Sequence, residues 1–226
     1  MIQDLDMRDS IFLKLIDYAK KDKNLIILTL DFGSPKLEYF KKKYPKQYMN
    51  VGICEQNAIT IAAGLASEGK NVFVYSISSF IILRALEQIK LDICFNNNPI
   101  TILAVGAGYA YDTAGPSHHS TEDVSIARSI SGLDVYSPSD NQTACSILDS
   151  IYKKNKKNYL RLERGKYNNY KISKVDLNRG YRKFGASKKC LIITYGNNFH
   201  RVLELTKNNF PKEKIAILDL FKFNPL

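Results

Sequence analysis

Short, almost uninterrupted apolar runs alternate with longer amphipathic stretches, and this alternation constrains the fold more than any other feature. The runs at 24–30, 71–77 and 100–105 have the length and composition of buried strands, whereas 8–22 carries apolar residues at helical spacing. Strands that are apolar on both faces and separated by helices indicate a parallel sheet covered on both sides. The sequence therefore predicts a doubly wound α/β domain.

The other expected elements continue this order. Further strands are predicted at 48–51, 133–137 and 158–163, and further helices at 36–43, 55–68, 79–95, 120–130 and 140–155. The helix at 55–68 is followed by Gly69, a common C-terminal stop signal.

The alternation weakens after the sixth predicted strand and then resumes. Residues 171–187 are polar and basic without periodicity, and are expected to form a linker. After them, CLIITYG, a helix at 198–208 and KIAILDL restart a strand–helix–strand pattern. A single unit of this kind cannot bury both faces of its sheet. We therefore expect a complete domain at 1–170 and, at 188–226, the start of a second α/β domain whose remainder is supplied elsewhere.

The composition argues against several classes of protein. The net charge is +11, but the lysine runs at 41–43 and 153–157 fall at expected helix ends, where cations are favoured and solvated. Zinc-finger spacing and aromatic RNA-binding motifs are missing, so no nucleic-acid partner is expected. No apolar run is long enough to cross a bilayer, and the first residues do not resemble a secretion signal. Four scattered cysteines without a Cys-x-x-Cys pair favour a reducing, cytoplasmic location.

Four polar segments fall where the strands of the predicted sheet end. They are LDFGS (30–34), GICEQNA (52–58), the loop at 106–119 and the end of LRLER (160–164). In doubly wound sheets, ligands bind beyond the carboxyl ends of the strands. These segments therefore define the expected functional site.

The most specific segment is GICEQNAITIAAGLASEG, in which Glu55 opens a helix directly after a strand. On position alone, Glu55 would be a first-turn acid favoured by the helix dipole. The run, however, resembles the G-I-x-E-Q-x-x-x-x-x-A-A-G-L-A signature of the pyrimidine-binding domain of the transketolase family. The resemblance implies that Glu55 is the carboxylate that hydrogen-bonds and activates the cofactor thiamine diphosphate.

Two more segments extend the resemblance. SSFIILRALEQIK (78–90) is similar to the family's S-T-F…R-A-x-E-Q-I-R stretch, which implies that Phe80 packs against the aminopyrimidine ring of the cofactor; an ordinary core phenylalanine is the alternative. Arg84 in this stretch is expected to be structural. The loop GAGYAYDTAGPSHHSTED resembles G-x-x-D-G-P-T-H, which implies that His118 is the active-site histidine and handles protons or substrate oxygens.

Two further residues carry implied roles. YLRLERGK resembles a strand that ends in a phosphate-binding arginine, here Arg164; a surface arginine paired with Glu163 is the alternative. Asp31 falls on an aspartate that lies near the cofactor or the dimer interface in the family.

The loop also departs from the family pattern. Ala114 stands where transketolases carry an aspartate that contacts a substrate hydroxyl, and Gly106 stands roughly where a substrate-contacting histidine is common. The resemblance therefore implies a sugar or sugar-phosphate substrate that is not the standard one.

The Gly-Asp-Gly…Asn motif that holds the diphosphate and Mg²⁺ (or Ca²⁺) is missing. The resemblance thus implies the C-terminal subunit of a split transketolase (EC 2.2.1 type), active only with an N-terminal, diphosphate-binding subunit. Self-association is expected, as in an α2β2 heterotetramer. The implied reaction moves a two-carbon ketol unit from a ketose to an aldehyde. The alternatives are a deoxyxylulose-phosphate-synthase-like or 2-oxo-acid-dehydrogenase-like subunit, and a non-catalytic scaffolding homologue.

Overall fold

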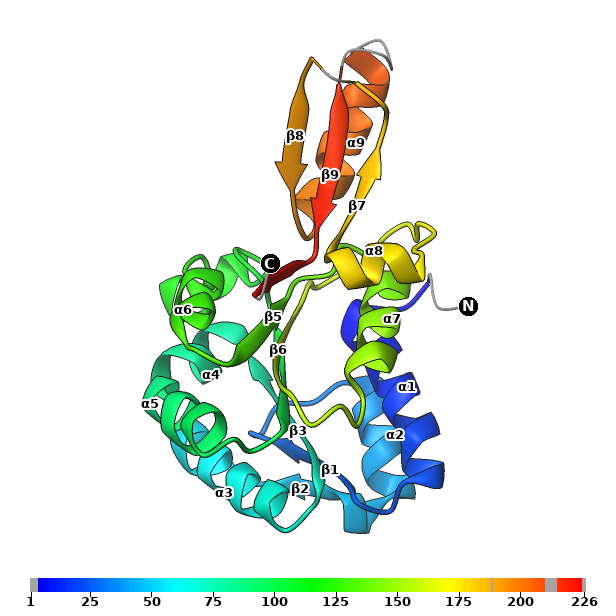
Figure 1. Ribbon diagram of the computed structural model, residues 1–226. Helices are drawn as coiled ribbons and strands as arrows, with labels where there is room; N and C mark the ends of the chain where they lie inside the picture. The colour runs from blue at the N-terminus through cyan, green and yellow to red at the C-terminus, as the bar shows by residue number, and fades with distance from the viewer. Residues whose placement is uncertain (1–3, 188, 210–214, 225–226) are drawn as a thin grey trace.

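A computed structural model describes residues 4–187, 189–209 and 215–224, and its largest element is a seven-stranded sheet (Figure 1). The strands lie in the order β10-β5-β6-β4-β3-β1-β2. Their bounds are β1 (Leu25–Thr29), β2 (Tyr48–Asn50), β3 (Asn71–Ile77), β4 (Ile100–Val105), β5 (Leu133–Tyr136), β6 (Lys157–Leu162) and β10 (Lys222–Asn224). Neighbouring strands from β5 to β2 pair in parallel, and β10 joins β5 in antiparallel orientation. The predicted doubly wound parallel sheet is confirmed.

Helices cover both faces of this sheet (Figure 1). One layer consists of α1 (Met7–Lys21), α2 (Pro35–Lys43) and α7 (Asn141–Ile151). The other consists of α3 (Glu55–Ser67), α4 (Ser78–Arg84), α5 (Leu86–Gln88), η2 (Ile89–Phe95) and α6 (Asp123–Ser129). Short helical turns occur at η1 (Pro45–Gln47), η3 (Asp112–Ala114) and η4 (Pro116–His118).

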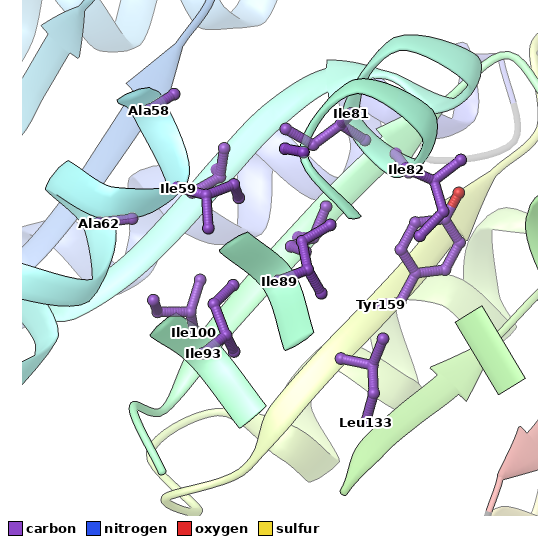
Figure 2. Close-up of a cluster of buried hydrophobic side chains, with 14 of the residues drawn as sticks. Ala58, Ile59, Ala62, Ile81, Ile82, Ile89, Ile93, Ile100, Leu133 and Tyr159 are labelled. Carbon is purple, nitrogen blue, oxygen red and sulfur yellow. The ribbon is translucent and has the colours of Figure 1, made fainter. Parts of the chain in front are cut away.

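The core on the α3–α6 side explains how α3 comes close to the sheet. Ala58 and Ala62 of α3 are fully buried, and their small side chains let the helix backbone approach its neighbours. Figure 2 shows them in one cluster with isoleucines of α4 and η2 and with Tyr159 of β6. This packing fixes the first turn of α3 at the carboxyl end of the strands.

The helix expected at 79–95 is interrupted. α4 ends at Arg84. The backbone of the next residue, Ala85, leaves the helical region (φ −112°, ψ 23°), and the chain continues through α5 into the π-helix η2. Wide turns of this kind occur often near functional sites. Ile89 and Ile93 of η2 remain fully buried, so the change in helical geometry keeps the apolar face on the sheet.

The second unit is a three-stranded sheet with one helix, and it projects from one end of the large sheet (Figure 1). It contains β7 (Tyr181–Phe184), β8 (Leu191–Thr194), α9 (Asn198–Asn209) and β9 (Ala216–Leu220). β9 lies in the centre, parallel to β8 and antiparallel to β7.

The residues expected to form a linker, 171–187, are instead structured. They contain α8 (Lys174–Arg179), which begins with a capping box between Ser173 and Asp176 and ends at the left-handed Gly180, and then β7. The six-residue helix and four-residue strand are too short to show a hydrophobic period. Residues 188–226 also do not all belong to the small unit, because the chain continues after β9 into β10, which joins the large sheet.

A buried ion network connects the two units. Arg182 of β7 donates from Nη2 to Asp140 Oδ2 at 2.6 Å and from Nε to Asp219 Oδ2 at 2.9 Å. The Ser139 hydroxyl also donates to Asp219 Oδ2, at 2.7 Å. Burial raises the pKa of Asp219 to about 6, although Arg182 acts in the opposite direction.

This raised pKa predicts a pH-dependent effect of Asp219→Asn on stability. The folded state binds the Asp219 proton more tightly than the unfolded state does. This proton binding therefore stabilises the fold fully below the ordinary pKa of 3.8, and the stabilisation is lost as the pH rises through about 6. The free energy of unfolding of the wild type, relative to that of the variant, should therefore increase between about pH 7.5 and about pH 5. Urea denaturation at both pH values measures it; a constant difference would contradict the assigned pKa.

Candidate active site

The segments expected to carry the site do meet at the carboxyl edge of the large sheet. Asp31 follows β1, Glu55 opens α3 after β2, and Phe80 lies in α4 directly after β3. His118 lies in the loop after β4, and Arg164 follows β6. The site is thus assembled from the ends of five strands of one sheet.

Glu55 is the most buried of these side chains. The residue is 5% exposed, and its Oε1 atom accepts a hydrogen bond from Arg84 Nη1 at 2.8 Å. Its second oxygen, Oε2, accepts none from the described residues. The residue Glu55 lines a surface pocket together with its neighbours in 53–57 and with Arg84. Arg84 therefore holds one carboxylate oxygen, Oε1, and the other, Oε2, remains free to accept a hydrogen bond from a ligand.

Phe80 and His118 form the next part of the site. Their ring centroids are 4.8 Å apart at an interplanar angle of 65°, and the Arg84 guanidinium carbon lies 4.0 Å from the centroid of the Phe80 ring. Phe80 is only partly buried. Phe80 therefore contacts His118 and also Arg84, the partner of Glu55, and its partial exposure does not fit the alternative of an ordinary core residue.

A short hydrogen-bonded chain orients His118. Its Nδ1 lies 3.0 Å from the Ser117 hydroxyl, and the Ser79 hydroxyl donates to the Ser117 carbonyl at 3.0 Å. His119 faces elsewhere, with its Nε2 3.3 Å from the carbonyl oxygen of Asp112 and its ring against Tyr109. Of the two histidines, His118 is the one directed toward Phe80.

Tyr111 is a site residue that the motifs did not indicate. Its ring lies 5.9 Å from the His118 ring and 4.5 Å from the Arg164 guanidinium carbon. Its hydroxyl is buried and has no hydrogen-bond partner within the described ranges. Burial raises the pKa of Tyr111, so the phenol is neutral and can donate a hydrogen bond.

Tyr111 also explains why position 106 is glycine. Gly106 has φ +93°, and a Cβ atom built there would come within 2.1 Å of Tyr111 Cε2. The space where the family commonly places a histidine is therefore filled by a ring from further along the same loop. Only the three-dimensional structure shows that Tyr111 fills this space, because Tyr111 matches no motif.

Gly106→Ala is expected to lower the free energy of unfolding by at least about 2 kcal/mol, since it combines a strained φ with a steric clash. It should also displace Tyr111 from His118. The control is Gly64→Ala on the exposed side of α3, where a Cβ meets no atom within 4 Å and the stability should hold or rise. Urea denaturation measures the free energy of unfolding of both variants. Equal values for Gly106→Ala and Gly64→Ala would contradict the packing of Tyr111 on Gly106.

Arg164 occupies one margin of the site. It is exposed, stacks on Tyr111 and points Nη1 toward the Ala110 carbonyl at 3.5 Å. The alternative pairing with Glu163 does not hold, because Glu163 is buried and accepts from Arg161 at 3.3 Å instead.

Asp31 lies at the opposite margin of the site and has a positive φ of +54°. Its N–H donates a hydrogen bond to Asn50 Oδ1 at 3.0 Å. Asn50 also accepts from the Gly52 N–H at 3.1 Å. The pair shapes the turn that leads into α3, and a contact of Asp31 with the cofactor stays a prediction.

A second set of residues that no motif indicated lies beneath the His118 loop. Asp123 Oδ2 accepts from Arg161 Nε at 2.8 Å, from the Ser78 hydroxyl at 2.9 Å and from the Tyr159 hydroxyl at 3.0 Å. Ser120 donates to Ser78 at 2.9 Å. The network thus ties the start of α4 and the end of the His118 loop to β6.

The donor set of the described residues fits only part of the cofactor. Glu55, Phe80 and His118 offer a carboxylate, a ring face and an imidazole, which suit a planar nitrogen heterocycle. Within ranges 4–187, 189–209 and 215–224, no three His, Cys, Asp or Glu side chains gather as metal ligands. In the same ranges, no helix is both long and apolar enough to span a bilayer.

Comparison with known proteins agrees with this geometry. The family described as transketolase, pyrimidine binding domain, matches residues 3–169. The chain belongs to this family. The match covers the large sheet from α1 to the end of β6, together with all the site residues described above.

Several relatives of the chain are subunits of transketolases, and others are 1-deoxy-D-xylulose-5-phosphate synthases, such as that of Desulfotalea psychrophila (39% identical over 127 residues; 56% of this chain, 19% of the relative). The chain is 40% identical over 127 residues to a subunit of the apulose-4-phosphate transketolase of Phocaeicola vulgatus (56% of this chain, 41% of the relative). It is 31% identical over 159 residues to a 6-deoxy-6-sulfo-D-fructose transketolase subunit of a Clostridium species (70% and 49%). In all three cases the matched part spans less than half of the relative.

A solved structure described as a split gene transketolase, inactive beta4 tetramer, superposes with a TM-score of 0.82 at 25% identity. The superposition covers 98% of this chain and 73% of the other. The small second unit is therefore included in the structural match.

Proposed function

We propose that the chain is the pyrimidine-binding subunit of a thiamine-diphosphate-dependent, transketolase-like transferase. The observation that carries the proposal is the Glu55–Phe80–His118 corner. It combines a nearly buried carboxylate with one unbonded oxygen, an aromatic ring beside it and an imidazole in edge contact with that ring. Family membership and the transketolase names of the relatives support it.

When bound, thiamine diphosphate supplies the electron sink that allows a carbon–carbon bond beside a carbonyl group to break and form. Glu55 Oε2 would hydrogen-bond the pyrimidine nitrogen, and Phe80 would stack on the pyrimidine ring. His118, oriented through Ser117, would hold or move a proton at a sugar oxygen. These three residues perform binding, orientation and proton handling from one edge of the sheet.

The remainder of the cofactor site would come from a partner chain. Residues 1–226 contain no Gly-Asp-Gly…Asn motif, and an N-terminal subunit would hold the diphosphate with Mg²⁺ or Ca²⁺. Both named transketolase relatives are single subunits, which supports a split enzyme, and the beta4 tetramer of a structural neighbour supports self-association. We therefore propose a heterotetramer, in a cytoplasm where the four free cysteines stay reduced.

The substrate would be a modified sugar or sugar phosphate. Ala114 and Gly106 lack the polar side chains expected at those positions, and Tyr111 fills the space beside Gly106. Arg164 stays exposed at the site margin, where its guanidinium could take an anionic group of the sugar. The names of the two transketolase relatives, with a sugar phosphate and a sulfonated sugar, support this direction.

Calorimetry on the natural chain mixed with its partner subunit tests the proposal. Thiamine diphosphate with Mg²⁺ should bind the mixture, and a panel of ketose donors and aldehyde acceptors should then reveal ketol transfer. A mixture that binds the cofactor without any transfer would favour a different thiamine reaction. A mixture that does not bind the cofactor would leave a scaffolding homologue as the better assignment.

A further inference from the structure

Arg84 is the side chain that touches both halves of the candidate pyrimidine site. Its Nη1 donates to Glu55 Oε1 at 2.8 Å, and its guanidinium carbon lies 4.0 Å from the centroid of Phe80. The arginine lies at the last residue of α4, one turn after Phe80 on the same helix. The sequence alone indicated a structural residue at this position.

The two partners of this ion pair differ in exposure. The Glu55 side chain is 6% exposed, whereas that of Arg84 is 46% exposed. A nearly buried carboxylate requires a partner for its charge, whereas a half-exposed guanidinium keeps much of its hydration. The contact therefore constrains Glu55 more than it constrains Arg84.

Stacking on Phe80 gives the guanidinium a defined plane. Arginine is a flat cation that stacks on aromatic rings and donates hydrogen bonds in a fixed fork, unlike the freely rotating ammonium of lysine. With the plane set by Phe80 and one hydrogen bond made to Oε1, the rotation of the Glu55 carboxylate is restricted. Oε2 accepts no hydrogen bond from the described part of the chain, and Glu55 is one of the residues that line the open pocket, so Oε2 is left available to a ligand.

We propose that Arg84 is a positioning residue, which holds Glu55 Oε1 and so presents Oε2 to the pyrimidine nitrogen of the cofactor. This inference rests on the proposed function. It adds that the carboxylate acts only when a second residue of the same chain fixes its orientation. Arg84 itself need not touch the cofactor or the sugars.

The test uses the natural full-length chain reconstituted with its partner subunit. Arg84→Gln should lower kcat by about thirtyfold or more, while KM for both sugars changes by less than about twofold, because sugar binding is not the step affected. The calorimetric Kd for thiamine diphosphate should weaken by about tenfold. Arg84→Lys keeps the charge without the fork and should recover part of both losses.

A double-mutant cycle separates positioning from direct contact. If Arg84 acts through Glu55, Arg84→Gln should change the cofactor Kd by less than about twofold in a Glu55→Ala background, where the acceptor of its hydrogen bond is removed. Lys90→Gln removes a like charge from an exposed position further along the same segment and serves as the control, with wild-type Kd and kcat expected. Circular dichroism checks that each variant is folded.

Three results would overturn the inference. Tighter cofactor binding by Arg84→Gln would mean that the arginine occupies the pyrimidine slot in the free chain. An unchanged Kd and kcat would mean that the contact is incidental. An equal effect of Arg84→Gln with and without Glu55 would mean that Arg84 contacts the cofactor itself. Wild-type turnover of Glu55→Gln alone would instead reject the proposed function.

Discussion

Replacing Glu55 with glutamine is expected to reduce kcat of the reconstituted complex by about a thousandfold or more, with the fold retained. Glutamine keeps the shape and the hydrogen bond from Arg84 but loses the negative charge next to the pyrimidine nitrogen. Because an amide cannot exchange a proton with that nitrogen, the loss should be in turnover and not in KM for the sugars. Steady-state kinetics with saturating cofactor measures both parameters.

Glu87→Gln is the matched control for this experiment. Glu87 lies on the exposed side of α5, so the same chemical change there should leave kcat and the midpoint of urea denaturation unaltered. Comparable rates for Glu55→Gln and Glu87→Gln would reject the assignment of Glu55 as the cofactor-activating carboxylate.

Asp123→Ala is expected to lower the free energy of unfolding by about 3–5 kcal/mol, because it leaves the guanidinium of Arg161 buried without its main counter-charge. Arg161 and Asp123 are 5% and 1% exposed. The substitution also removes the acceptor of the Ser78 and Tyr159 hydroxyls. Since Ser78 begins α4, the variant should also disturb Phe80. Urea denaturation measures the first effect and cofactor calorimetry the second.

Combining Asp123→Ala with Arg161→Met and Glu163→Gln should recover part of the lost stability, since the triple variant leaves neither Arg161 nor its second buried partner, Glu163, as an uncompensated charge. Asp112→Ala, at an exposed position in the loop that precedes α6, is the control and should change the unfolding free energy by less than about 0.5 kcal/mol. A loss below about 1 kcal/mol for Asp123→Ala would show that the network does not depend on this carboxylate.

The large sheet could be predicted, and candidate site residues could be named, because both have strong local signals. β3 and β4 were placed at their observed bounds, since strands buried on both faces are continuous apolar runs. Glu55, Phe80 and His118 lie in segments with recognisable motifs at strand ends, and parallel strands bring those ends to one edge.

The remaining features depend on contacts between residues far apart in the chain. The sequence predicts a structural role for Arg84 and does not reveal its partner Glu55, which lies 29 positions earlier on another helix. The ion pair of Arg161 with Asp123 spans 38 positions, and an arginine in a strand does not reveal its partner. Tyr111 matched no motif, because its role arises from the absence of a side chain at Gly106.

The return of β10 to the large sheet has a consequence for folding during synthesis. β5 receives its antiparallel neighbour only after the chain has passed through the entire small unit, from Tyr136 to its partner Lys222. Until residue 224 leaves the ribosome, one edge of β5 offers unpaired backbone groups to other nascent chains. The second hydrogen-bonded neighbour of β5 is therefore formed only after the whole small unit has been synthesised.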